Sequence, residues 1–327
     1  MVSQSQFLSG CTANDIAIAV AHLFAGDLVA FPTETVYGLG ADAINSQAVA
    51  RIYEAKGRPS DHPLIVHIAS IDGMTNWASE VPEYAFSLAR NFWPGPMTLV
   101  LRRSELASDF ITGGQDTVGV RVPNHLVALW LLEEFEKSGG KGVAAPSANR
   151  FGHVSPTTAS AVIEELGSHL SKDDLVLDGG ACEVGVESTI IDCTGLIPRV
   201  LRPGAVSIAM IQAATGLNCQ DAEQIEIRVS GSLENHYSPN AKVILDKIPI
   251  AGQGFLALAE VETPPGVIRL AKPKDVSEFA QLLYSSLRTA DAQGLTEVIV
   301  IQPLGDEIAI AVRDRLERAS RGLNLEV

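Results

Sequence analysis

The chain has 327 residues, of which 46% are hydrophobic and 19% are charged, and its net charge is −15. This length predicts two domains or one large one, and this composition excludes a mainly disordered protein. No apolar run approaches the roughly 18 residues that a membrane span needs, and the N-terminus does not resemble a signal peptide. The negative charge argues against non-specific binding to nucleic acid, because that affinity comes largely from Lys and Arg.

The predicted elements of the first two hundred residues alternate between helices and strands. Thr12 and Asp15 resemble a capping box, apolar residues follow at helical spacing, and Gly26 predicts the end of that helix. Further helices are predicted at residues 46–55, 83–91, 124–135, 157–166 and 206–214. Strands are predicted at residues 28–31, 64–68, 98–101, 118–122, 143–145, 175–177 and 188–191. This alternation predicts an α/β domain with a twisted mixed sheet over residues 1–214.

Neither helical nor strand periodicity is sustained between residues 215 and 240. We interpret this stretch as a linker, because a loop of this length is usually functional or disordered. A second α/β domain is expected over residues 241–327. Its strands are predicted at residues 242–245, 254–258, 266–270 and 298–302, and its helices at 276–291 and 306–322. This order predicts a small open sheet with flanking helices, Rossmann-like in outline, but no G-x-G-x-x-G motif indicates dinucleotide binding.

The four cysteines, Cys11, Cys182, Cys193 and Cys219, form no C-x-x-C pair and have no regular spacing. This usage is typical of reduced thiols rather than of a disulfide framework or a zinc site. We therefore expect a cytoplasmic protein.

Two polar loops follow predicted strands or helices in the first third of the chain, where the usual nucleotide-binding and hydrolase motifs are missing. The first, PTETVYGLG at residues 32–40, offers hydroxyls and backbone N–H groups to a small ligand. The second, KGRPSDHPL at residues 56–64, combines Lys56 and Arg58 with further donors, which suits a polyphosphate. The alternatives are an ordinary turn for the first loop and a solvated pair of cations for the second.

Two later segments have the same character. AAPSANR at residues 144–150 leads to Ser155 at the start of a predicted helix, where an anion is favoured. Turn formation and helix capping would explain Asn149 and Ser155 equally well. The fourth segment, residues 185–204, contains Ser188 and also Arg202, which we expect to be a loop cation.

Seven stretches carry a resemblance to a known family: FPTETVYGLGADA (31–43), KGRPSDHPLIVHI (56–68), FWPGPMTLVL (92–101), VGVRVPNH (118–125), APSANRFGHVSPT (145–157), VESTIID (186–192) and VLRPGAVS (200–207). Together they resemble the YrdC-like family. The linker ending in HYSP and the small second domain resemble its two-domain form, the threonylcarbamoyl-AMP synthases. The resemblance covers most of residues 12–214.

This resemblance implies that L-threonine, bicarbonate or carbon dioxide, and ATP give L-threonylcarbamoyl-AMP and pyrophosphate, with Mg²⁺ accompanying ATP. The product would pass its threonylcarbamoyl group to an adenosine in tRNA through separate tRNA-modifying proteins. Neither stable tRNA binding nor a membrane is expected. An anion attacks a polyanion in this nucleotidyl transfer, so cations matter more than a nucleophile or a strong base.

The family pattern assigns five positions to threonine: Thr35, His67, Arg121, Ala145 and Ser188. Arg121 is expected to bind the threonine carboxylate, because its planar group can donate two parallel hydrogen bonds. From its sequence position alone, His67 is more typical of a structural histidine. The pattern assigns eight positions to ATP: Arg58, His62, Thr117, Ser147, Asn149, Ser155, Arg202 and Tyr237. Lys56 and Arg58 are expected to be the catalytic cations, and no residue is assigned to a metal.

Two expectations concern the nucleotide directly. The family commonly has Asn at the position of His62, and a histidine that titrates near pH ~6.5 would strengthen ATP binding when protonated. The linker over residues 215–240 is expected to be a lid that excludes water from a reactive mixed anhydride, with Tyr237 over the nucleotide. A passive tether is the alternative.

Two other functions fit parts of the sequence. One is a non-catalytic RNA-binding module, against which the negative charge and the scarcity of aromatic residues near the cations argue. The other is a carbamoyl or acyl transferase that makes an adenylate of a different amine. Pyrophosphate exchange into ATP, with threonine and with other amino acids, would separate these possibilities.

Overall fold

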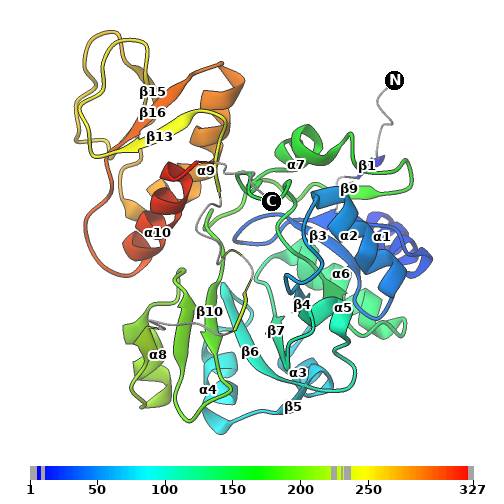
Figure 1. Cartoon of the computed structure of the whole chain (residues 1–327). Helices are drawn as coiled ribbons and strands as arrows, with labels where there is room; N and C mark the ends of the chain where they lie inside the picture. The colour runs from blue at the N-terminus through cyan, green and yellow to red at the C-terminus, as the bar shows by residue number, and fades with distance from the viewer. Residues whose placement is uncertain (1–5, 9–11, 222–226, 230, 232–236, 323–327) are drawn as a thin grey trace.

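The computed structural model describes residues 6–8, 12–221, 227–229, 231 and 237–322, which form two α/β domains (Figure 1). The large domain has helices α1 Ala13–Ala25, α2 Ser46–Lys56, α3 Met74–Trp77, α4 Glu83–Phe92, α5 Asp109–Thr112, α6 Leu126–Lys137, α7 Ala159–Leu166 and α8 Ile208–Thr215. Its strands are β1 Gln6–Leu8, β2 Val29–Phe31, β3 Gly38–Asp42, β4 Ile65–His67, β5 Ala78–Glu80, β6 Met97–Arg103, β7 Thr117–Arg121, β8 Val143–Ala144, β9 Leu175–Leu177, β10 Thr189–Asp192, β11 Arg199–Arg202 and β12 Gln220–Asp221. None of the described helices is both long enough and apolar enough to span a bilayer.

The large sheet mixes parallel and antiparallel pairs in the order β1-β9-β2-β3-β8-β4-β7-β6-β10-β11-β12, and β5 pairs with β6. Strands β4 and β7 run parallel, with His67 opposite Arg121 at their ends. Strand β10 runs parallel to β6, so Ser188, just before β10, enters the sheet beside Met97. The predicted twisted mixed sheet is confirmed, and its topology brings loops that are distant in sequence to one edge.

The first predicted helix is confirmed at both ends. The Thr12 side chain caps α1 by accepting the N–H of Asp15 at 3.2 Å, and Gly26 ends it at a φ of 87°. The apolar face buries Ile16 and Leu23, whereas Phe24 is 44% exposed. The helix therefore packs through a narrower face than its apolar residues suggest.

Two strands were missed by the sequence analysis. Strand β3 occupies the second half of the loop expected at residues 32–40, although its sequence GLGAD has little β propensity. A Cβ at Gly40 would lie 2.8 Å from both the Phe31 ring and Val143, so glycine lets β2, β3 and β8 pack closely. The expectation that Arg202 is a loop cation is wrong, because it ends strand β11 and is 3% exposed.

The second domain contains strands β13 Lys242–Leu245, β14 Gly254–Leu256, β15 Ile268–Ala271 and β16 Glu297–Val300, and helices α9 Val276–Ala292 and α10 Ile308–Ser320. All pairs in its sheet, ordered β13-β16-β14-β15, are parallel, as predicted. Both helices pack on the face that carries Val298 and Val300, whereas Ile299 faces a separate cluster under the loops. The helices lie between this sheet and the large domain (Figure 1).

The expected linker is described in part. Residues 222–226, 230 and 232–236 lie outside the described residues. Tyr237 and Ser238 are buried, and the N–H of Ser238 donates to the Gly152 carbonyl at 3.0 Å. The domain boundaries at residues 214 and 240 and the lid role stay predictions.

Candidate active site

A cavity of about 450 Å³ lies at the edge of the large sheet where the polar loops converge. It is lined by all five residues assigned to threonine: Thr35, His67, Arg121, Ala145 and Ser188. Ser147, Arg202 and Tyr237 of the ATP set also line it. Segments separated by two hundred residues of chain thus form one site.

Arg121 is already paired with a carboxylate. Its Nη2 lies 2.8 Å from Glu34 Oε1 and donates to Thr35 Oγ1 at 2.9 Å, and both charged side chains are buried. The other Glu34 oxygen accepts the N–H of Asn124 at 3.0 Å. Glu34 was missed as a site residue, although it lies inside the first polar loop. Because Glu34 balances its charge and fixes its position, Arg121 is held in place before any ligand binds.

A relay of hydroxyls fixes the orientation of Thr35. Thr33 Oγ1 donates to the Val36 carbonyl at 2.6 Å and lies 2.8 Å from Thr35 Oγ1. Because Thr33 has a single hydroxyl hydrogen, Thr35 must donate to Thr33. Thr35 therefore offers a lone pair, rather than a hydrogen, to a ligand in the cavity.

His67 stands beside Arg121 as a neutral imidazole. It is 4% exposed, and its ring meets the Phe31 ring edge-on at a centroid distance of 5.8 Å. Burial, and then the nearby Arg121 charge, lower the pKa of His67 to about 3. His67 can therefore shape the cavity and form hydrogen bonds, but it adds no charge near neutral pH.

The Ser188 backbone is held by Arg202. The Ser188 carbonyl accepts from Nε of Arg202 at 3.1 Å and from Nη2 at 2.9 Å, while Ser188 Oγ lies 2.8 Å from Thr98 Oγ1. A Cβ at Gly204 would lie 2.3 Å from the backbone nitrogen of Thr189, so only glycine allows β11 to turn away so close to β10. Burial lowers the pKa of Arg202.

Lys56 joins two polar loops from inside the protein. It is 2% exposed, and its ammonium donates to the carbonyls of Ser147, at 2.6 Å, and Asn149. The Asn149 amide in turn donates to the carbonyls of Arg150 and His153, at 2.7 and 2.9 Å. Burial, and then the charge of Arg58, hold the pKa of Lys56 well below its usual value. An anion nearby would relieve this cost.

Arg58 is buried against Phe151, with its guanidinium 5.7 Å from the ring centroid. One Nη donates to the Pro63 carbonyl at 3.0 Å. Burial lowers the pKa of Arg58 to about 10, so it remains a cation at neutral pH. Half-buried His62 meets the other side of this cluster, with its ring 5.3 Å from that of Phe151. Burial, and then Arg58, lower the pKa of His62.

Two residues of the ATP set lie away from the cavity. Thr117 lines a second cavity of about 300 Å³ with apolar walls, which shares Ile65 with the first. Ser155 is fully buried, and its hydroxyl donates to Glu187 Oε1 at 2.7 Å. Lys56, Arg58, His62 and Asn149 also lie outside the lining of the first cavity. The roles assigned to all these residues stay proposals.

An anion-sized cavity with a paired arginine, next to buried cations and a second cavity, defines a two-domain α/β enzyme for a small polar substrate and a nucleotide. The family model described as "Telomere recombination" matches residues 21–204, and the one described as "Threonylcarbamoyl-AMP synthase, C-terminal domain" matches residues 206–321. The chain belongs to the family of threonylcarbamoyl-AMP synthases.

Relatives match nearly the whole chain. The threonylcarbamoyl-AMP synthase of Pyrococcus abyssi is 41% identical, over 93% of this chain and 94% of the relative. That of Bacillus subtilis is 38% identical, over 94% and 93%. Among solved structures, P. abyssi Sua5 complexed with L-threonine superimposes with a TM-score of 0.84 at 39% identity, covering 94% of each chain. The resemblance predicted from the sequence is confirmed.

Proposed function

We propose that this chain makes L-threonylcarbamoyl-AMP from L-threonine, bicarbonate or carbon dioxide, and ATP, with release of pyrophosphate. The observation that carries the proposal is the convergence of Thr35, His67, Arg121, Ala145 and Ser188 on one cavity beside the buried cations Lys56 and Arg58. The solved relative that contains L-threonine and the names of the relatives support the choice of substrate.

In this proposal the first cavity holds threonine. The guanidinium of Arg121 keeps N–H groups for the substrate carboxylate, since only Nη2 is committed to Glu34 and Thr35. Thr35 accepts a hydrogen bond from the substrate amine or hydroxyl, as its own hydrogen points to Thr33. Ala145 contributes only its carbonyl, because its N–H donates to the Ile65 carbonyl.

The nucleotide lies along the third and fourth polar segments. We assign its phosphates to Lys56, Arg58 and Arg202, with Ser147 and Asn149 on the loop that Lys56 supports. We assign its base to the second cavity, where Thr117 and Gln115 offer polar groups between apolar walls. His62 borders the phosphates, Ser155 acts through Glu187, and Tyr237 forms a wall between the two substrates.

The chemistry follows from the charges. The threonine amine adds to carbon dioxide and loses a proton, and a carbamate oxygen then attacks the α-phosphorus while pyrophosphate leaves. Two like unit charges about 4 Å apart repel by roughly 4 kcal/mol at an effective dielectric near 20. Cations that lack a carboxylate partner before ATP binds are suited to remove this barrier.

Mg²⁺ is proposed to enter with ATP. Among the described residues, no group of three His, Cys, Asp or Glu side chains is arranged to hold a metal ion. Such a site fits an ion coordinated by phosphate oxygens and water, which is how Mg²⁺ usually accompanies nucleotides.

The proposed product is an intermediate for others. We propose that separate tRNA-modifying proteins take it up, that stable tRNA binding is not required, and that the chain acts in the cytoplasm. Cys182 and Cys193 are buried thiols, which is consistent with a reducing compartment.

The decisive experiment is mass spectrometry of a reaction containing ATP, Mg²⁺, threonine and bicarbonate. We expect threonylcarbamoyl-AMP, with pyrophosphate formed only when all the substrates are present and no tRNA is needed. Full pyrophosphate formation in bicarbonate-depleted buffer would contradict the mechanism. Product formation with another amino acid in place of threonine would indicate the alternative adenylate.

A further inference from the structure

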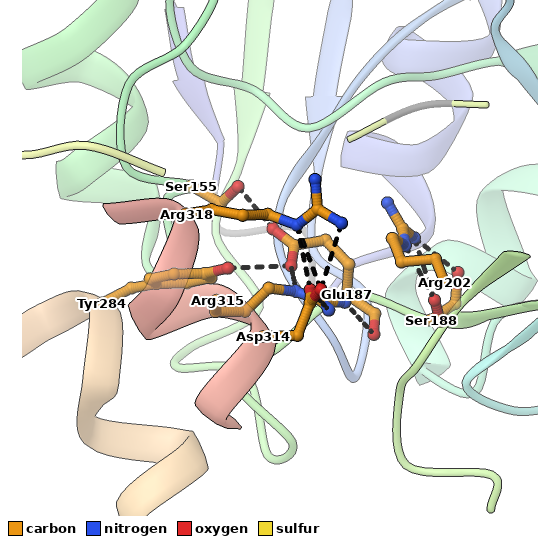
Figure 2. A network of polar contacts seen from close by, with 8 residues as sticks. All are labelled: Ser155, Glu187, Ser188, Arg202, Tyr284, Asp314, Arg315 and Arg318. Atoms are coloured by element: carbon orange, nitrogen blue, oxygen red, sulfur yellow. Dashed lines mark hydrogen bonds and ion pairs between the residues drawn. The ribbon is translucent and has the colours of Figure 1, made fainter. Parts of the chain in front are cut away.

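The second domain reaches the cavity through Arg315 of α10 (Figure 2). Its Nε donates to Glu187 Oε2 at 2.9 Å, and its guanidinium lies 5.4 Å from the centroid of the Tyr237 ring. Glu187 and Tyr237 both line the cavity, whereas Arg315 is fully buried behind them. One side chain of the second domain therefore supports two walls of the site.

Glu187 collects donors from both domains. Its Oε1 accepts from Ser155 of the large domain at 2.7 Å, and its Oε2 accepts from Tyr284 of α9 at 2.8 Å as well as from Arg315. Burial alone would raise the pKa of Glu187, but the charges of Arg315 and Arg202 outweigh it and lower the pKa. The carboxylate is therefore ionised and fixed at neutral pH.

Two arginines hold consecutive carbonyl groups next to the cavity. Arg315 Nη2 donates to the Glu187 carbonyl at 3.4 Å, and Arg202 donates to the Ser188 carbonyl at 2.9 and 3.1 Å. One arginine comes from each domain, and Ser188 lies between the two contacts. The orientation of Ser188 in the threonine cavity thus depends on a residue far from it in the sequence.

We propose that Arg315 is a positioning residue for the synthesis of threonylcarbamoyl-AMP, aligning Ser188 and Tyr237 from the second domain. The inference rests on the proposed function. It also gives the second domain a role at the site, although no residue of that domain lines the cavity. The role requires a planar group that reaches the Glu187 carboxylate, the Glu187 carbonyl and the Tyr237 ring together, which a lysine cannot do.

The test compares Arg315→Lys with Arg313→Lys. Arg313 lies on the same helix but donates to the carbonyls of Pro303 and Gly305 within its own domain, at 2.8 and 2.9 Å. We expect Arg315→Lys to raise the threonine KM and lower kcat, reducing kcat/KM by about tenfold, while Arg313→Lys stays within about twofold of wild type. Thermal unfolding and calorimetric binding of L-threonine are measured on the same samples.

A purely structural role makes a different prediction. Arg315→Lys would then lower the unfolding temperature but leave threonine KM and threonine affinity at wild-type values, and that result would overturn the inference. If Arg315→Lys does not fold, the double variant Arg315→Gln with Glu187→Gln removes both buried charges. A wild-type threonine KM in the double variant would also overturn it. A wild-type chain that forms no threonylcarbamoyl-AMP refutes the proposed function instead.

Discussion

The two sides of the site treat positive charge in opposite ways. On the threonine side, Arg121 is paired with Glu34 before any substrate binds. On the nucleotide side, Lys56 and Arg58 are just as buried, but among the described residues they donate only to backbone carbonyls, and neither lies at ion-pair distance from a carboxylate. A balanced cation can recognise shape at little electrostatic cost, whereas an unbalanced one is suited to attract a polyanion.

Replacing Arg58 should give the largest effect and test the unbalanced side. We expect Arg58→Ala to slow synthesis at least about 100-fold, a loss of about 2.7 kcal/mol of transition-state stabilisation. The measurement is the pyrophosphate-release rate at saturating substrates, with the exposed Arg90→Ala as the control.

The same residue tests the cost of an unbalanced charge. Arg58→Met keeps an apolar stem against Phe151 but removes the buried cation. We expect its unfolding free energy without ligands to equal or exceed that of wild type, since the desolvation cost is gone. A clear loss of stability would show that the charge is compensated in the free protein.

Replacing Arg121 should instead damage both stability and threonine binding. Arg121→Ala leaves the Glu34 carboxylate buried without its partner, which typically costs about 3–5 kcal/mol. We expect the threonine KM to rise roughly 30-fold, in line with the loss of a charged hydrogen bond, and the ATP KM to change little. Adding Glu34→Gln should restore stability but not threonine binding. If Arg121→Ala weakened ATP alone, the assignment of the two sides would be wrong.

Tyr237 stands between the two sides and should give an intermediate effect. We expect Tyr237→Ala to reduce synthesis at least about tenfold, because the cavity loses a wall that Arg315 supports. Tyr237→Phe keeps the ring and should lose less. Substrate titrations show which substrate is affected, and circular dichroism checks the fold. Wild-type activity in Tyr237→Ala would remove the residue from the site.

His62 should give the smallest effect and change the nucleotide side with pH. Because burial and Arg58 lower its pKa below about 6.5, protonation begins only under acid conditions, later than the sequence alone suggested. As the pH falls below about 6, the new charge should lower the ATP KM roughly two- to threefold. The control is His62→Asn, and the same pH profile in that variant would contradict the idea.

His62 also illustrates the stability consequence of a lowered pKa. A histidine whose folded pKa lies below its unfolded value binds fewer protons when folded. Its contribution to stability is therefore present above the unfolded pKa and is lost as the pH falls toward the folded one. His67, with a pKa of about 3, follows the same sign over a wider window.

The sequence predicted local elements well because they follow from local patterns. The helix over residues 13–25 could be predicted from its cap, its apolar face and its terminal glycine. Strand β3 could not, because its glycines favour a strand only when Phe31 and Val143 pack closely on both sides. Arg202 was misplaced for a similar reason, since β11 is a short strand defined by its pairing with β10.

The candidate site was predictable as a set of residues but not as a set of contacts. Polar residues after strands, together with the family resemblance, indicated the five residues that line the threonine cavity. No local pattern indicated that Glu34 pairs with Arg121 or that Arg315 reaches Glu187. Those contacts join segments far apart in sequence, so only the folded topology reveals them.

The position of Arg315 also has a consequence for the order in which the chain is made. Proteins are synthesised from the N-terminus, and domains generally begin to fold as they emerge. Glu187 and Tyr237 leave the ribosome long before α10, so both wait for the Arg315 contacts while the large domain is already folding. A nascent chain that has not yet exposed α10 therefore carries an unfinished site, and catalytic competence arrives late in translation.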